Sequence, residues 1–304
     1  MHKYGYTRAT LKNQGLAPKK RFGQNFLVYK STAESIVRSA RLSKNDTVIE
    51  VGVGLGALTV PLARAVHYVY GYEIDSGIIR LHKEKGDLPA NVNLIHNDIL
   101  KADLKELHNE IGDLIILANL PYSISNPFIF KLIDNHTLLS TATVMLQKEV
   151  ADRLVARPGT KEYGIPTILL GACASVEKLL TLKPSEFHPR PKIDSIVVRI
   201  DFNSPAVSFP GNSLENDILP PLFPRVVRIA FSQRRKTVLN TLSGGGFFLK
   251  QLKGDGRKNK ELTRQAIEEA GLNPSIRPEC ITIEEFMRVS GIITKLISGG
   301  DISA

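Results

Sequence analysis

The feature that most constrains the fold of this chain is a regular alternation of strand-like and helix-like segments between residues 47 and 146. Short apolar runs predict strands over Thr47–Val51, His67–Glu73, Val92–His96, Leu114–Ala118 and Ala142–Leu146. Helical spacing of apolar residues predicts helices over Gly56–Val66, Ser76–Lys85 and Ile124–Asp134. This alternation predicts an α/β fold with a mainly parallel sheet and helices on both of its faces.

The flanking segments extend this pattern. Ser31 and Glu34 have the spacing of a capping box, which predicts a helix that begins at Ser31. A further helix is predicted over Gly164–Ala174. Val176–Leu182 and Ile193–Phe202 read as two antiparallel strands that close the sheet.

The character of the sequence changes near Asn203. The segment 204–224 is rich in Pro, Ser and Asn, which is typical of a connection. Beyond it the spacing is helical, over Arg225–Phe231, Lys260–Ala270 and Glu284–Ile293. We therefore expect an α/β domain with a basic N-terminal segment over residues 1–203 and a small helical domain over residues 204–304.

The charge of the chain favours a polyanionic partner. Its 304 residues carry a formal net charge of +10, which makes nucleic acid a better partner than a membrane surface, although a basic protein without such a partner stays possible. The two cysteines, Cys173 and Cys280, share no metal-binding or redox spacing, so we expect no metal and a reducing, cytoplasmic location. No apolar run approaches the roughly 18 residues of a membrane span, and the N-terminus has no apolar core for a signal peptide.

A glycine-rich loop, Glu50-Val-Gly52-Val-Gly54-Leu-Gly56-Ala57, lies between the first predicted strand and helix. Glycines let the backbone turn tightly and let a ligand approach it closely. Glu73 ends the next strand, where an acidic side chain binds ribose hydroxyls. The loop alone fits either a nicotinamide cofactor or S-adenosylmethionine, since both carry an adenosine, and a purely structural turn is the third reading.

Two carboxylates favour S-adenosylmethionine. Asp98 ends the third strand, where it could accept a hydrogen bond from an adenine amino group, or could simply cap a turn. Glu50 lies just ahead of the glycine loop, where its charge would repel a pyrophosphate and attract a sulfonium or an ammonium group.

Asn119-Leu120-Pro121-Tyr122 follows the fourth strand and offers hydrogen-bond acceptors and a flat ring to a planar guest. The amino nitrogen of adenine is a poor nucleophile because its lone pair is delocalised into the ring. An Asn119 side-chain oxygen and a carbonyl near Leu120 or Pro121 would accept its two hydrogens and turn that lone pair toward a methyl donor. Tyr122 would stack on one face of the base, with Phe187 as the candidate for the other face and Phe128 as a lesser one.

Two basic clusters are candidates for phosphate contacts. They consist of Lys19, Lys20 and Arg21, and of Arg234, Arg235 and Lys236. A third group, Lys253, Arg257, Lys258 and Lys260, is better explained as a solvated charged surface.

Several motifs occur together in an order that resembles the small-subunit rRNA adenine N6-dimethyltransferases. They are Gln24–Leu27, the Glu50–Gly56 loop, Glu73, Asp98, Asn119–Tyr122, Phe187–Ser195 and Phe231–Asn240. The resemblance implies a Rossmann-like class I methyltransferase fold that uses S-adenosylmethionine. It also implies dimethylation of two adjacent adenosines in the hairpin loop near the 3′ end of 16S rRNA within a pre-30S particle, a role in ribosome biogenesis, and a monomer.

By motif, the resemblance implies a cofactor site lined by Asn25, Leu27, Gly52, Gly54, Glu73, Asp98 and Asn119. Val53, Ser123 and Asn126 depart from the residues frequent in this family at their positions and leave the proposed donor and acceptor groups intact. Three alternatives remain at this point: the large-subunit (23S) rRNA adenine methyltransferase of the macrolide-resistance type, a non-catalytic RNA-binding assembly factor, and a nicotinamide-dependent oxidoreductase. The oxidoreductase lacks an evident proton donor and leaves Asn119–Tyr122 unexplained.

Overall fold

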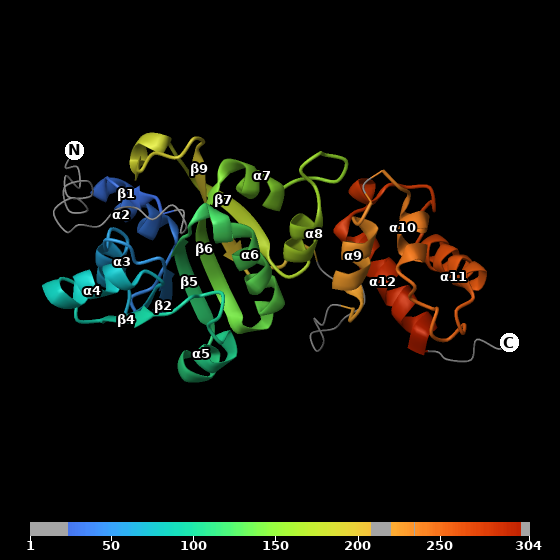
Figure 1. Ribbon diagram of the computed structural model, residues 1–304, viewed down its shortest axis with the longest axis horizontal. Coiled ribbons are helices and arrows are strands. Elements are labelled where there is room, and N and C mark those ends of the chain that lie inside the picture. Colours follow the sequence, from blue (N-terminus) through green and yellow to red (C-terminus); the bar gives the residue numbers. More distant parts are fainter. Residues whose placement is uncertain (1–23, 208–219, 234, 299–304) are drawn as a thin grey trace. The chain divides into compact units, whose positions relative to one another are not determined.

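The computed structural model describes residues 24–207, 220–233 and 235–298 (Figure 1). Contacts divide the chain into two compact units, residues 1–152 with 174–204 and residues 153–173 with 205–304. The first unit contains the sheet, and the described part of the second is helical.

The first unit is built on a seven-stranded sheet in the order β4-β3-β2-β5-β6-β9-β7. Its strands are β2 (Thr47–Val51), β3 (Tyr68–Glu73), β4 (Val92–His96), β5 (Leu114–Asn119), β6 (Leu139–Gln147), β7 (Ser175–Leu182) and β9 (Ser195–Asp201). Strands β2 to β6 run parallel, and β9 pairs antiparallel with both β6 and β7. The predicted α/β class, the parallel sheet and the antiparallel closing pair are confirmed.

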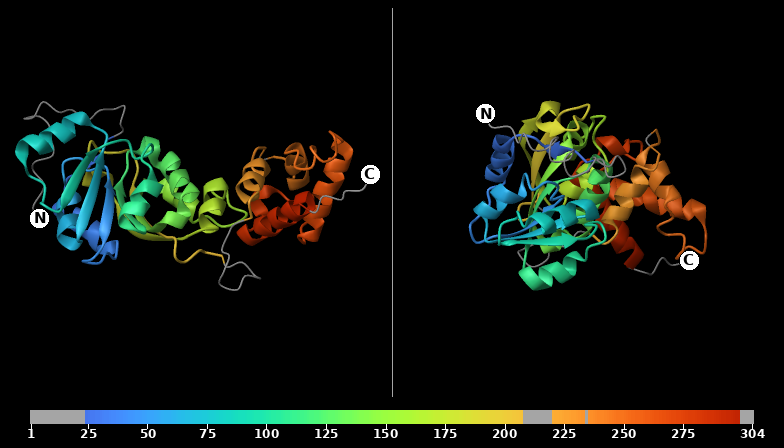
Figure 2. Two further views of the ribbon diagram at one scale, coloured as in Figure 1. Left: turned by 90° about the horizontal axis from the view of Figure 1, so that it is seen from below. Right: turned by 60° about the vertical axis from the view of Figure 1, so that its left-hand side comes forward.

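The α-helices that accompany the sheet are α2 (Lys30–Ser39), α3 (Thr59–Ala65), α4 (Ser76–Lys85), α5 (Leu104–Ile111), α6 (Ser125–Asp134) and α7 (Lys148–Leu154). Single 3-10 turns occur at η2 (Tyr122–Ile124), η3 (His136–Leu138) and η4 (Pro184–Glu186). Figure 2 shows the strands and helices of this unit from two further directions.

Both faces of the sheet are buried, which explains why its central strands are continuous apolar runs. Val48 and Leu117 pack with α2 and α3 in one core cluster. Their neighbours Ile49 and Ile116 are also buried, and they point to the opposite face because side chains alternate along a strand. A strand covered on both sides therefore lacks the polar alternation of an exposed sheet.

The order of the strands places a crevice at the carboxyl ends of β2 and β5. The chain moves outward from β2 through β3 to β4, and then returns to pair β5 against the other side of β2. In open parallel sheets, ligands bind where the direction of winding reverses in this way.

A two-stranded pair outside the main sheet joins distant parts of the sequence. Strand β1 (Phe26–Leu27) pairs antiparallel with β8 (Phe187–His188), and Val28 N donates to Glu186 O at 2.9 Å. The pair brings the Gln24–Leu27 motif beside the Phe187–Ser195 motif. Apolar spacing could not predict it, because two residues are too few to show a period.

The predicted start of the first helix is wrong. Helix α2 begins at Lys30 after Tyr29, and no side chain caps its N-terminus. Ser31 lies inside the helix, because the pairing of β1 with β8 sets where the extended chain turns. Sequence patterns also missed α5, although the Asp103 side chain caps it by accepting from Lys105 N and Glu106 N.

The second unit contains five α-helices in its described residues. They are α8 (Ile165–Gly171), α9 (Phe223–Ala230), α10 (Val238–Gly244), α11 (Gly256–Glu269) and α12 (Ile283–Ser298), with a 3-10 turn η5 (Pro278–Cys280). Helix α9 buries Phe223, Val226, Val227 and Ala230, the spacing of a helical stripe that faces a core.

The predicted domain division and the observed units differ in one segment. Residues 153–173, which include α8, belong with the helices of the second unit. Tyr163 Oη donates to Ile281 O at 2.9 Å, and Gly159 N donates to Glu279 O at 2.7 Å. The position of α8 along the chain, between sheet strands, gave no sign of these contacts. Across the described ranges, no helix has the length and apolar character needed to cross a membrane.

A buried asparagine joins two parts of the second unit. Asn259 on α11 donates through Nδ2 to Ser243 O at 2.9 Å, and its Oδ1 accepts from Phe248 N at 3.2 Å. Replacing it by alanine leaves a carbonyl and an amide without partners in the interior. We expect Asn259→Ala to lower the free energy of unfolding by about 2–3 kcal/mol, measured by urea denaturation with circular dichroism. Asn240→Ala, at an exposed position on α10, is the matched control and should change it little.

Candidate cofactor and acceptor site

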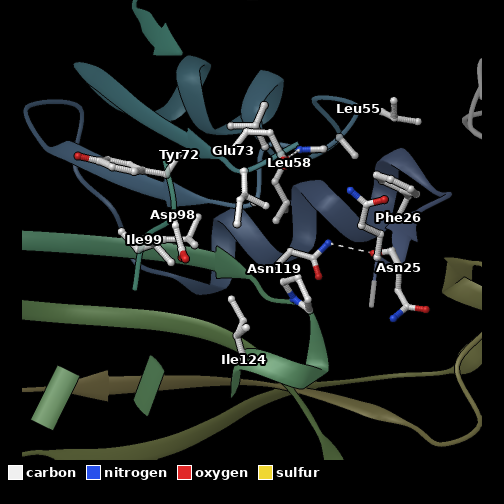
Figure 3. Close-up of a pocket in the computed structure, with 18 of the residues that line it drawn as sticks. Asn25, Phe26, Leu55, Leu58, Tyr72, Glu73, Asp98, Ile99, Asn119 and Ile124 are labelled. Carbon is white, nitrogen blue, oxygen red and sulfur yellow. Dashed lines mark hydrogen bonds between the residues drawn. The ribbon is translucent and has the colours of Figure 1, made fainter. Parts of the chain in front are cut away.

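A pocket opens at the carboxyl ends of the central parallel strands, at the reversal point of the sheet (Figure 3). Its walls come from the N-terminal segment 24–27, the glycine loop after β2, the ends of β3 and β4, and the residues after β5. Apolar side chains form much of the wall, including Phe26, Leu55, Leu58, Tyr72, Ile99 and Ile124.

The glycine loop lies against the end of β5 at a distance that only glycine permits. Gly52 has φ +84°, and a Cβ atom there would lie 2.8 Å from Asn119 O. Gly54 has φ +55°, and its Cβ would lie 3.2 Å from the Phe26 ring. A side chain at either position would strain the backbone and displace a wall of the pocket.

Glu73, at the end of β3, holds the glycine loop in place. Its Oε2 accepts from Gly54 N at 2.9 Å, and its Oε1 accepts from Asp75 N at 2.9 Å. The side chain is buried at 5% exposure, and burial raises its pKa against the opposing effect of these hydrogen bonds. Each carboxylate oxygen keeps a second lone pair, so the group can still accept from ligand hydroxyls.

The loop after β4 is supported from α6. Lys131 Nζ donates to Ala102 O at 2.6 Å and to Leu100 O at 3.2 Å. Burial lowers the pKa of Lys131, and the charges of Asp103 and Asp98 oppose this effect. Asp98 Oδ1 also accepts from Leu100 N at 3.0 Å, so the loop holds Asp98 in the pocket wall.

Asn119 faces the N-terminal segment across the pocket. Its Nδ2 donates to Asn25 O at 3.4 Å, and Figure 3 shows the side-chain oxygen directed away from this bond. With this assignment of the amide, the oxygen is available as an acceptor for a guest molecule.

All seven residues expected to line the cofactor site line this one pocket, together with Pro121. They are Asn25, Leu27, Gly52, Gly54, Glu73, Asp98 and Asn119. Leu120 and Tyr122 are not among the residues that line it: Leu120 is buried, and the half-buried Tyr122 has its hydroxyl 2.7 Å from Ser195 Oγ. Burial raises the pKa of Tyr122, and the bond to Ser195 lowers it in part.

The expectation that Phe187 offers a face to a substrate base is not met in this structure. Phe187 is 2% exposed and packs in the core cluster with Leu27 and α2. Phe128, the lesser candidate, is also fully buried. Both rings are used for packing, because pairing with β1 places Phe187 inward and α6 directs Phe128 toward the core.

Glu50 is also placed differently from the expectation. It is fully buried and does not line the pocket, so it does not face a ligand ammonium or sulfonium group. Thr59 Oγ1 on α3 donates to its Oε1 at 3.0 Å, and Oε2 has no hydrogen-bond partner among the described residues. Burial raises the pKa of Glu50 to about 8.

Two supporting contacts were not predicted from the sequence. Gln24, in the Gln24–Leu27 motif, was given no role of its own, and its Nε2 donates to Asp75 Oδ2 at 3.2 Å. His82 on α4 belongs to no recognisable motif, and its Nε2 lies 2.8 Å from Gly54 O. Asp75 did carry a signal, since an Asp directly before a helix is a typical N-cap, and its Oδ1 accepts from Gly77 N.

The charges of the pocket select among ligands. Glu73 and Asp98 contribute carboxylates, and the described lining contains no Lys, Arg or His. A dinucleotide pyrophosphate would find no cation there, whereas an adenosine attached to a sulfonium group meets apolar walls and negative charge. The residues present therefore fit S-adenosylmethionine better than a nicotinamide cofactor.

The expected nucleic-acid clusters are only partly visible. Lys19, Lys20, Arg21 and Arg234 lie outside the described residues. Arg235 and Lys236 are exposed, just ahead of α10. Among residues 24–207, 220–233 and 235–298, no group of His, Cys, Asp and Glu is arranged to hold a metal ion.

Comparison with known proteins identifies the family. The sequence profile of the ribosomal RNA adenine dimethylases matches residues 15–269. The chain belongs to the ribosomal RNA adenine dimethylase family. This family membership makes it a methyltransferase and confirms the resemblance drawn from its motifs.

Close relatives of this dimethylase cover almost its whole length. A protein named ribosomal RNA small subunit methyltransferase A from Desulfotalea psychrophila is 57% identical over 293 residues, or 96% of this chain and 97% of that protein. A protein of the same name from Anoxybacillus flavithermus is 38% identical over 93% of each chain.

Solved structures agree with this assignment. A dimethyladenosine transferase from Plasmodium falciparum matches with a TM-score of 0.70 and 26% identity, over 87% of this chain and 95% of that one. The 23S rRNA methyltransferase ErmE matches with a TM-score of 0.60 and 21% identity, over 88% and 99% of the two chains. At 21% identity, the match to ErmE shows only that the two proteins share a fold.

The buried Glu50 predicts a pH dependence of stability. Its pKa is about 8 in the folded protein against an ordinary value of 4.5, so folding takes up a proton between these values. The free energy of unfolding should therefore fall as pH rises from about 5 to about 8, by up to about 4 kcal/mol from this group. Glu50→Gln, which is neutral throughout, should flatten this slope in urea denaturation.

Glu84→Gln is the control for this measurement, because Glu84 is exposed on α4. It should keep the slope of the wild type. Equal slopes for the wild type and Glu50→Gln would show that Glu50 is already ionised in the folded protein near neutral pH.

Proposed function

We propose that this protein dimethylates N6 of two adjacent adenosines in the 3′-terminal hairpin loop of 16S rRNA, with S-adenosylmethionine as methyl donor, during 30S biogenesis. The observation that carries the proposal is the pocket itself: Glu73, Asp98 and Asn119 line one cavity that has no described cation. Membership in the rRNA adenine dimethylase family supports the reaction, and the names of the relatives support the small-subunit target.

For the cofactor, we assign three groups of contacts. Glu73 would accept hydrogen bonds from ribose hydroxyls, and Asp98 would accept from the adenine amino group. Asn25 and Leu27 close the pocket from the N-terminal side, and the backbone of Gly52 and Gly54 allows close approach to the ligand. When bound, S-adenosylmethionine supplies an electrophilic methyl group on a positively charged sulfur.

For the acceptor, we assign the strand end after β5. The Asn119 side-chain oxygen and a backbone carbonyl at Leu120 or Pro121 would accept the two hydrogens of the target amino group. This contact makes the nitrogen lone pair available for in-line attack and holds it in place. Alignment of this kind can contribute about 7–11 kcal/mol, so no strong general base is needed and the proton leaves to water.

Tyr122 would stack on one face of the target base. Its hydroxyl is fixed by Ser195 on β9, which limits the orientations of the ring. Stacking on an aromatic ring is worth roughly 1–3 kcal/mol per base. Because Phe187 and Phe128 are packed in the core, we leave the opposite face of the base without an assigned ring.

For the partner, we propose rRNA within a pre-30S particle, bound by a monomer in the cytoplasm. The exposed Arg235 and Lys236 in the second unit would contact phosphates, which adds affinity without reading sequence. Lys19, Lys20, Arg21 and Arg234 would extend this contact. The net charge of +10 is consistent with such a partner.

The reaction is tested with methyl-labelled S-adenosylmethionine and three substrates: immature small subunits, protein-free 16S rRNA and protein-free 23S rRNA. We expect label at adenosine N6 in small subunits, with two methyl groups on each of two adjacent bases. Asn119→Ala should reduce the rate by at least about 100-fold while much of the RNA affinity is kept, because it removes a group that aligns the nucleophile.

The comparison of the three substrates distinguishes the proposed function from its two alternatives. Preferential labelling of 23S rRNA would favour the large-subunit activity. No label above a heat-inactivated control, together with retained binding to small subunits, would favour a non-catalytic assembly factor.

The proposed hydrogen bonds from the ribose hydroxyls to Glu73 give a separate prediction. Glu73→Ala removes both the ligand acceptor and the anchor of Gly54 N, so affinity for S-adenosylhomocysteine should fall at least about tenfold in calorimetry. Affinity for rRNA should be largely kept. Glu84→Ala on α4 is the exposed control. Unchanged ligand affinity in Glu73→Ala would remove Glu73 from the cofactor site.

A further inference from the structure

A buried histidine lies beneath the glycine loop and is used by none of the roles assigned above. His82 is on α4 and is 4% exposed. Its Nε2 lies 2.8 Å from Gly54 O, and its Nδ1 lies 2.7 Å from Asp87 Oδ1. The ring also fills the space beside Gly56, where a Cβ atom would lie 3.6 Å from His82 Cε1.

Both partners of this ring are hydrogen-bond acceptors. A backbone carbonyl and an ionised carboxylate can only accept hydrogen bonds. The contact that holds the glycine loop is therefore the one in which Nε2 carries hydrogen and donates to Gly54 O.

His82 and Glu73 hold the same loop residue from opposite sides. Glu73 Oε2 accepts from Gly54 N, and His82 Nε2 lies at Gly54 O. The backbone of Gly54 is therefore fixed at both of its polar atoms by side chains from β3 and α4. Since Gly54 lines the pocket, this arrangement determines the shape of the wall that a ligand meets.

We propose that His82, held by Asp87, is a positioning residue for the glycine loop and thereby strengthens binding of the methyl donor. The proposal rests on the proposed function, in which S-adenosylmethionine occupies this pocket. His82 does not touch the ligand in this account. It fixes the loop before the ligand arrives, so less ordering is needed on binding.

Asp87 holds the other nitrogen of the ring. It comes from the segment after α4 and contacts Nδ1 directly, while Glu73 reaches the same loop residue from the end of β3. The neighbours Lys83, Glu84 and Lys85 on α4 are exposed.

The experiment measures the affinity of the full-length protein for S-adenosylhomocysteine by calorimetry at one fixed pH. The readout is the ratio between the dissociation constant of each variant and that of the wild type.

Three variants separate the hydrogen bond from packing. His82→Leu keeps bulk without a donor, and should bind about tenfold more weakly than the wild type. His82→Gln offers an amide donor to Gly54 O, and should recover part of this loss. Asp87→Asn keeps a polar partner for Nδ1, and should bind nearly as tightly as the wild type.

His67→Gln is the matched control, because His67 is exposed just before β3, away from Glu73 at the other end of that strand. It should bind like the wild type. Equal affinities of His82→Leu and the wild type would overturn the proposal, and so would a His82→Gln variant that binds no better than His82→Leu. A wild type that binds no ligand would instead count against the proposed function.

Discussion

The structure depends on one close approach, between the glycine loop after β2 and the end of β5. The position of a Cβ atom on Gly52 lies 2.8 Å from Asn119 O, so any side chain there would push the two segments apart. The first segment forms a wall of the pocket, and the second carries Asn119, the proposed acceptor group. Transfer of a methyl group needs donor and acceptor sites in contact, and the absence of one side chain makes this possible.

Around this contact, polar and charged side chains bond mainly to the protein itself. Glu73 accepts from two backbone amides, Lys131 donates to the loop that carries Asp98, and His82 contacts Gly54 O. The loops after β2 and β4 are thus held by side chains from other elements. A pocket shaped in advance loses less conformational entropy when a ligand binds, which is an advantage for a site that must also align a reaction.

Local patterns predicted much of the fold, and the predictions failed where contacts between distant segments determine the structure. Strands buried on both faces and helices of regular spacing were predicted within a few residues, as at β2, β4 and α4. The capping box at Ser31 was wrong because pairing of β1 with β8 determines where the chain turns into α2. Helix α8 lies among sheet strands in the sequence, yet its partners are residues more than a hundred positions later.

By itself, the sequence determined the α/β class, the family and the pocket, because strand ends that carry Gly52, Glu73, Asp98 and Asn119 must meet at one edge of a parallel sheet. Only the tertiary structure decided what the remaining candidates do. Phe187 and Glu50 proved to be packed in the interior, and His82 proved to lie under the glycine loop. Burial and hydrogen-bond partners arise from segments far apart in the chain, so no local pattern of residues can carry that information.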